Sequence, residues 1–358
     1  MTMPEMDWPS CATLARWEAA SEADVYEELS ECGAGDGLPI VRPTKAALHA
    51  FLEPHGFSGT ELIARVPPFE QEASTEALAV CAILAGCQPA HLPVLCAIVR
   101  ALADPKLNAI GILSTTGSVA LAIIINGPIR SQLAFNAAGN CLGPGVRSNA
   151  TVGRALGFVT RGLGGSIPGI GDMSTMGQPG KYTFCIAENE EQSPWEPLHV
   201  ERGFARDEST VTLVGAAGTI EVVNTFAHAP PEMLDELART MAGTSGALLD
   251  AESTIGGGQP LVLTSPEWAR TFETHGLAKS DLKRMLFQKA LRSLESLPAK
   301  QADEIRRQRR EAVYPADAPL RIALRPEDIH IVVTGGVGIK QTYVPSWSGG
   351  SGVVTVRV

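Results

Sequence analysis

The sequence predicts an α/β protein with layered mixed sheets and helices, built as two intimately packed subdomains. Apolar runs of strand length alternate with apolar or amphipathic runs of helix length along most of the chain, as expected for helices packed on sheets. Glycines cluster beside these runs, for example at 139–145 and 335–338, which indicates close backbone approaches within a folded core. A chain of 358 residues is long enough for two domains or one large one.

The N-terminal part is predicted to be mainly helical. An amphipathic helix is expected over about 10–31, with Leu14, Trp17, Val25 and Leu29 on its apolar face. Two strand-like runs follow later, in the segment NAIGILSTTGSVALAIIING. The other helices are expected over 44–56 (capped by Thr44), 74–86, 88–105 and 148–165 (capped by Ser148 or Asn149).

The C-terminal part is predicted to alternate strands with helices. Its clearest unit is an apolar strand followed by Ser265 as N-cap, Pro266 at the first helical position and a helix that Gly276 ends. The other strands are expected within 181–188, 209–226, 327–343 and 352–358, and the other helices over 230–243 and from Ser280 or Asp281 onward.

The pattern divides the chain into three parts. Residues 1–32 form an N-terminal helical segment. Residues 33–225 form a first α/β subdomain with a glycine loop and an acidic segment that contains His, Glu and Arg. Residues 226–358 form a second α/β subdomain with a glycine and lysine loop.

Composition narrows the class of partner. A net charge of −10 and a pI near 5.3 argue against nucleic acid, because phosphate neutralisation needs basic patches. The basic run RRQRR is expected to be a solvated helix face. No apolar signal core or membrane-length apolar run is visible. Seven cysteines without a CxxC pair favour a reduced, cytoplasmic protein, and a homo-oligomer is left open.

Residues 180–203, GKYTFCIAENEEQSPWEPLHVERG, carry a dense group of side chains that transfer protons. His199, Glu188 and Glu201 are candidate catalytic residues, because carboxylates and imidazoles serve as general acids and bases. Lys181 and Arg202 are candidates for binding an anionic group of a substrate. The alternative is a surface loop with solvated glutamates, above all for the two central ones. If the segment is catalytic, it is expected to border the largest pocket.

Two glycine loops are candidates for binding an anion. NAAGNCLGPG offers Asn140 and backbone amides, and TGGVGIK offers Gly335, Gly336 and Lys340 directly beyond a strand. Neither loop has the G-K-[ST] ending of a P-loop or the GxGxxG fingerprint, so no nucleotide cofactor is predicted. The alternative is a pair of tight structural turns. Because ligands gather beyond the carboxyl ends of strands, both loops are expected to meet at one site next to His199.

The cysteines offer a different chemistry. Cys141, in the first glycine loop, and Cys185, on a strand, are candidate nucleophiles. Cys81, Cys87 and Cys96 stand in apolar runs and are expected to be core residues. The seven histidines are scattered without an HExxH pattern, so no metal site is predicted.

Several phrases together resemble the bacterial UGSC-type (seleno)proteins and their thiol-disulfide and uncharacterised relatives. The likeness covers most of residues 33–347 and supports the fold unit more than a reaction. Its motifs are GDGLPIVRPT (35–44), LAGCQPAHLPVLCAIVRAL (84–102), INGPI (125–129), GKYTFCIAENEEQSPWEPLHVERGF (180–204), LTSPEWARTFETHGLAKSDLKRML (263–286) and VVTGGVGIKQTYVPSW (332–347).

The chain also departs from that family. It has no UGSC stretch, so the resemblance does not imply selenocysteine chemistry here. The resemblance places histidine where this chain has Gln178, Trp268 and Gln341. It therefore implies that a metal site or acid/base set of the relatives is altered here.

These observations predict a cytoplasmic enzyme that acts on a small anionic metabolite without a cofactor. The expected chemistry is acid/base elimination, addition or hydrolysis. The predicted enzyme class is therefore a lyase or hydrolase rather than an oxidoreductase. Two alternatives stay open. One is a thiol-dependent covalent or redox enzyme that uses Cys141 or Cys185, and the other is a binding subunit without catalysis.

Overall fold

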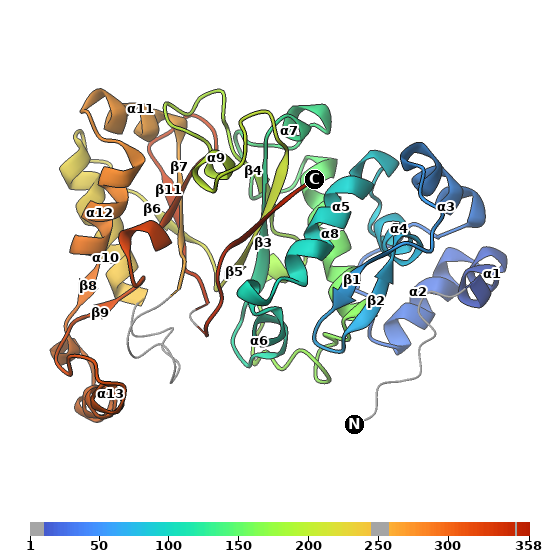
Figure 1. Ribbon diagram of the computed structural model, residues 1–358, viewed down its shortest axis with the longest axis horizontal. Coiled ribbons are helices and arrows are strands. Elements are labelled where there is room, and N and C mark those ends of the chain that lie inside the picture. Colours follow the sequence, from blue (N-terminus) through green and yellow to red (C-terminus); the bar gives the residue numbers. More distant parts are fainter. Residues whose placement is uncertain (1–10, 245–257, 348) are drawn as a thin grey trace.

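The computed structural model describes residues 11–244, 258–347 and 349–358 (Figure 1). Its α-helices are α1 (Cys11–Ala19), α2 (Glu22–Glu31), α3 (Lys45–Leu52), α4 (Thr75–Ala85), α5 (Leu92–Leu102), α6 (Ala109–Ser114), α7 (Ile129–Gln132), α8 (Arg147–Phe158), α9 (Leu198–Glu201), α10 (Pro230–Thr244), α11 (Pro266–Thr274), α12 (Lys279–Lys289) and α13 (Ala299–Glu311). Its strands are β1 (Leu62–Val66), β2 (Gln71–Ser74), β3 (Ala120–Asn126), β4 (Cys185–Ala187), β5 (Thr210–Ala216), β6 (Ile220–Val222), β7 (Leu261–Thr264), β8 (Leu291–Arg292), β9 (Leu320–Arg321), β10 (His330–Val333), β11 (Gln341–Val344) and β12 (Val354–Arg357).

The centre of the molecule consists of two sheets that pack face to face (Figure 1). An apolar layer between them contains alternate residues of the strands, such as Ala122 and Ile124 of β3 and Val332 of β10. The intervening residues of β3, such as Ile123, belong to the core under the helices. Because side chains alternate across a strand, each inner strand contributes to two cores at once.

Both sheets are mixed, which confirms the predicted fold class. The first has the strand order β12-β5-β3-β4 and the second the order β10-β7-β11-β6. β3 runs parallel to β4, and β7 runs parallel to β10, whereas the other pairs in these sheets are antiparallel. The last strand, β12, pairs with β5, so the chain returns to its first sheet after completing the second.

Helices cover the outer faces of both sheets (Figure 1). α5 and α8 lie over the first sheet, α4 packs against these two helices, and α10, α11 and α12 lie over the second sheet. α4 lies between α8 and α3 and is buried along almost its whole length, which explains why its sequence is apolar on all sides. None of the helices in the described ranges is both long enough and apolar enough to cross a membrane.

Two expectations about the N-terminal half are wrong in detail. The predicted helix over 10–31 is two helices, because Ser21 begins α2 with a capping box that it shares with Asp24. The first strand-like run before β3 is helix α6, which begins at Asn108, where the side chain accepts from the amide of Gly111. The predicted apolar face is correct, since Leu14 and Trp17 are buried.

The predicted cap of α8 is also wrong. Val146 is the N-cap residue and gives no side-chain hydrogen bond. Asn149 lies inside the helix, where its side chain accepts from the amide of Asn136 and donates to the carbonyl of Cys185. This asparagine ties α8 to β4 and to the glycine loop instead of capping the helix, which sequence spacing does not reveal.

The strand, cap and helix unit in the C-terminal half is confirmed. β7 ends at Thr264, Ser265 accepts from the amide of Trp268 at 3.3 Å, and Pro266 opens α11. Gly276 follows the helix with a φ of 75°, a left-handed conformation that favours glycine.

Substituting Ser265 with Ala should lower the free energy of unfolding by about 1 kcal/mol, because the first turn of α11 loses its side-chain acceptor. Urea denaturation followed by circular dichroism measures the change. Ser265→Thr is the matched control, since it keeps a hydroxyl acceptor. Equal stabilities of the Ala variant and the unmodified chain would show that the cap does not stabilise the fold.

Candidate functional site

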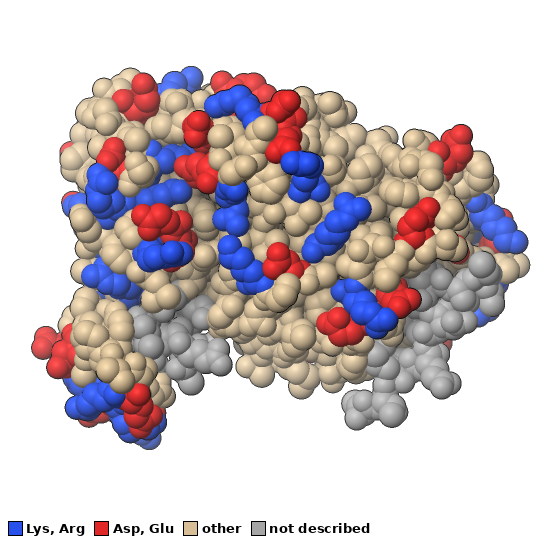
Figure 2. Space-filling model, in the orientation of Figure 1, with Lys and Arg blue, Asp and Glu red and all other residues tan. Residues whose placement is uncertain are grey.

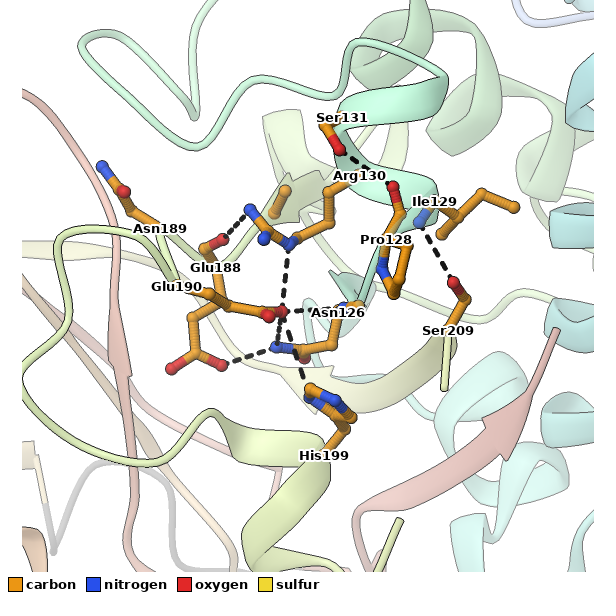
Figure 3. Close-up of polar contacts among 12 residues, drawn as sticks. Asn126, Pro128, Ile129, Arg130, Ser131, Glu188, Asn189, Glu190, His199 and Ser209 are labelled. Carbon is orange, nitrogen blue, oxygen red and sulfur yellow. Dashed lines mark hydrogen bonds and ion pairs between the residues drawn. The ribbon is translucent and has the colours of Figure 1, made fainter. Parts of the chain in front are cut away.

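Two carboxylates of the acidic segment that follows β4, those of Glu188 and Glu190, are enclosed by the protein (Figure 3), whereas Glu191 is exposed. Glu188 is fully buried. Its Oε2 accepts from Asn126 Nδ2 and from the amide of Leu198, each at 2.7 Å. These two bonds join the carboxyl end of β3 to the start of α9, so Glu188 acts as an internal brace.

Glu190 has a similar role beside it (Figure 3). Its Oε1 accepts from the amide of Gly127 at 2.7 Å and from Asn126 Nδ2 at 3.0 Å, and it lies 2.9 Å from Arg130 Nε. Arg130 also donates to Glu191. Burial lowers the pKa of Arg130, but Glu191 and Glu190 outweigh that effect and raise it above its ordinary value. The alternative of freely solvated glutamates therefore does not hold for Glu190.

His199 is fully buried in the same cluster. Its Nδ1 lies 3.9 Å from Glu190 Oε1, and its Nε2 lies 3.4 Å from the carbonyl oxygen of Arg206. Lys181, Tyr182 and Phe184, at the start of the 180–203 segment, line a cavity of about 590 Å³, whereas His199 and Arg202 do not line it. The part of the segment around Glu188 and Glu190 makes the internal contacts that hold the strand ends.

Glu201 and Arg202 lie on another side of this cluster, beside α12. Glu201 lies 3.1 Å from Lys283 Nζ and 3.7 Å from Lys279 Nζ. Lys279 also lies 3.6 Å from Glu188 Oε1. A chain of alternating charges thus runs from the buried Glu188 outward to a cavity that Glu201 and Arg202 line.

The two glycine loops meet, as predicted. A Cβ on Gly336 would lie 2.9 Å from the Cα of Gly139, so only glycine permits this approach. The loops line a cavity of about 190 Å³ together with Cys141 and Lys340. His199 does not line it, which corrects the expectation that the loops meet next to this histidine.

The other candidates near the loops have partners of their own. Lys340 forms an ion pair with Glu221 at 2.8 Å. The side chain of Asn140 donates to the carbonyl of Pro144 within its own loop. The amide of Gly335 donates to the carbonyl of Ala137.

The cysteines differ in access. Cys141 lines the glycine-loop cavity. Cys185 lies inside β4, and burial raises the pKa of its thiol, so it does not present a thiolate. Cys81, Cys87 and Cys96 are buried core residues, as predicted.

A cavity of about 590 Å³ that described residues line is here called the Arg161 cavity. It lies at the amino-terminal end of β3 and against α8, with Leu121, Leu156 and Phe184 among its apolar walls. Ligands of α/β sheets usually gather at the carboxyl ends of strands. Here the buried charge cluster fills that end of β3 and β4, and the free space is at the opposite end.

Arg161 is the distinctive polar group of this cavity. It stands in the π-helical segment Val159–Leu163 that continues α8, and such segments often mark functional sites. Its Nε donates to the carbonyl of Ala34, and its guanidinium lies over the ring of Phe158. Burial lowers the pKa of Arg161, although Asp36 counteracts the effect. No carboxylate of a described residue forms an ion pair with it.

Lys181 brings a second cation to the Arg161 cavity. Its Nζ donates to Asp172 Oδ2 at 2.5 Å and to Ser174 Oγ at 2.6 Å. Burial favours the protonated form of Asp172, but the hydrogen bonds from Lys181 and Ser174 keep its pKa below the ordinary value. An ionised carboxylate and an ammonium group therefore stand side by side at the wall of the cavity.

The sequence offered only a weak signal for this site. Lys181 was a predicted binding residue, but Arg161 and Asp172 were not. Both stand at the ends of the glycine-rich stretch 162–171, whose turns fold them against one cavity. Gln178, one of the positions where the resemblance places histidine, also lines it.

Comparison with protein-family models, with curated proteins and with solved structures finds no match to the chain. The resemblance to the UGSC-type proteins stays a prediction. Within the described ranges, no group of three or more His, Cys, Asp or Glu side chains is arranged to hold a metal ion.

Replacing Arg130 with Met should lower the free energy of unfolding by about 3–5 kcal/mol, because the buried Glu190 carboxylate loses its cation. Urea denaturation measures the loss. Arg65→Met is the control, since Arg65 and Glu72 are more than half exposed and such pairs contribute at most about 1 kcal/mol. Similar losses in the two variants would contradict a bracing role for the cluster.

Proposed function

We propose that this protein is an enzyme that binds a small anionic metabolite in the Arg161 cavity. One observation carries the proposal: a half-buried guanidinium, without an ion pair to a carboxylate of a described residue, lines a cavity of about 590 Å³. Cavities with apolar walls and a few convergent polar groups are the usual form of small-molecule sites. An anionic group of the substrate supplies the acceptor that Arg161 lacks.

The proposed chemistry is acid/base elimination, addition or hydrolysis. Lys181 supports it, because an ammonium group held by Asp172 and Ser174 can give a proton or stabilise a developing negative charge. Arg161 is the binding group in this scheme, and Lys181 is the group that acts on the reacting atoms. Free thiols are present at Cys32, Cys81, Cys87, Cys96, Cys141 and Cys185, which supports a reduced, cytoplasmic setting as part of the proposal.

Arg161→Gln should weaken binding of the best ligand from a panel of small carboxylates and phosphate esters. The loss of a charged hydrogen bond predicts a change of roughly 1.5–3 kcal/mol, or about ten- to a hundredfold in Kd. Isothermal titration calorimetry measures it. Arg100→Gln, on the exposed side of α5, is the control and should bind like the unmodified chain. Unchanged binding in Arg161→Gln would exclude this cavity.

Lys181→Met should slow turnover of that ligand by about 10²–10⁴ if Lys181 moves a proton. The measurement is kcat under saturating ligand, compared with KM. A change in KM alone would make Lys181 a binding residue only. Stoichiometric binding without turnover by the unmodified chain would instead favour a binding subunit.

A thiol enzyme is the second candidate, and one observation favours it. Cys141 lines the glycine-loop cavity beside Gly336 and Lys340. Iodoacetamide should then abolish activity, and substrate should protect against the loss. Cys141→Ala with full activity would exclude this mechanism.

A further inference from the structure

A second charged cavity lies between α9 and α12, beside the start of β10. It holds about 340 Å³, and Arg202, Lys283 and His330 contribute its basic groups. It shares no lining residue with the Arg161 cavity. The proposed function does not use it.

Two polar atoms of this cavity's lining residues lack hydrogen-bond partners. Arg202 Nε is buried without an acceptor, although Nη2 of the same residue donates to the carbonyl of Val353 at 2.8 Å. His330 is 5% exposed, and its Nε2 also has no partner. Buried donors and acceptors are nearly always paired in folded proteins. Two unpaired nitrogens in residues of one cavity therefore point to a ligand that supplies acceptor oxygens.

The cavity is lined by Arg202 and Lys283 and also by the carboxylates Glu201 and Glu327, and Arg202 is the lining cation that has no ion pair with a described carboxylate. Burial lowers the pKa of His330 well below its ordinary value, and nearby Lys283 and Arg202 lower it further, so the imidazole is neutral. Glu201 is the carboxylate close to Lys283 and to Lys279. Lys279 also lies 3.6 Å from Glu188 Oε1, whereas Arg202 has no ion pair with a described carboxylate. Figure 2 shows Lys and Arg side chains in a column on this face, between α12 and α5.

We propose that this cavity binds a small oxyanion, the carboxylate or phosphate group of a metabolite, through Arg202, Lys283 and His330. Arg202 Nε donates to one oxygen of the group, and the neutral His330 donates from Nε2 in the matching tautomer. Lys283 supplies a charge at the wall of the cavity. Glu327 also lines the cavity and is exposed, so the bound group enters past a carboxylate that disfavours large polyanions.

Isothermal titration of the full chain with malonate, and separately with inorganic phosphate, tests the site. Each probe is titrated into the unmodified chain, Arg161→Gln, Arg202→Gln and Arg206→Gln. Arg206 is exposed four residues along the chain and is the matched control for the loss of one positive charge. The Arg161→Gln variant shows whether a probe binds in the Arg161 cavity instead of this one. The proposal for this cavity and the proposed function can therefore be refuted independently.

At least one probe should bind, and Arg202→Gln should weaken that binding about tenfold or more. Arg206→Gln and Arg161→Gln should retain it. Binding of malonate alone identifies carboxylate recognition, and binding of phosphate alone identifies phosphate recognition. No binding of either probe at millimolar concentration overturns the proposal, as does equal binding by Arg202→Gln. If Arg202→Gln does not fold, as judged by circular dichroism, Lys283→Gln decides in the same way.

Discussion

The packing of one sheet directly against another constrains the rest of this structure. The layer between the sheets is made of side chains such as Ile124, Leu263 and Val344, and the opposite faces of the same strands are covered by helices. Inner strands are therefore buried on both sides and must be apolar at successive positions, as β3 is throughout except at its last residue. Sheet faces hidden in this way leave space for ligands only at strand ends and edges.

The carboxyl end of the β3–β4 pair is filled by charge rather than by a ligand. A strand that ends inside the protein leaves polar groups buried at its end. Burying a polar group costs free energy unless the group has a hydrogen-bond partner. Asn126, the last residue of β3, satisfies this demand by donating to Glu188 and Glu190. Arg130 balances the negative charge. Glu188, one of the candidate catalytic residues of the 180–203 segment, thus holds the end of β3 to the start of α9.

The remaining cations differ in whether a carboxylate accompanies them. Lys340 and Lys181 each have a close acidic partner, whereas Arg161 and Arg202 have none among the described residues. Burial lowers the pKa of both arginines, because a charge removed from water without a counterion is unfavourable. This shared imbalance is the physical basis for the two anion sites that we propose.

The sequence by itself determined the fold class and most of its local elements, because these depend on short-range patterns. The spacing of hydrophobic residues, the cap at Ser265 and the glycine that ends α11 can each be identified from about ten consecutive residues. The contact between Gly139 and Gly336 was predictable only from the rule that loops gather at strand ends. Tertiary structure alone decided that His199 is buried and that Arg161 faces a cavity. Whether a charged side chain forms an ion pair depends on residues that are far away in the sequence. The local sequence pattern does not identify those residues.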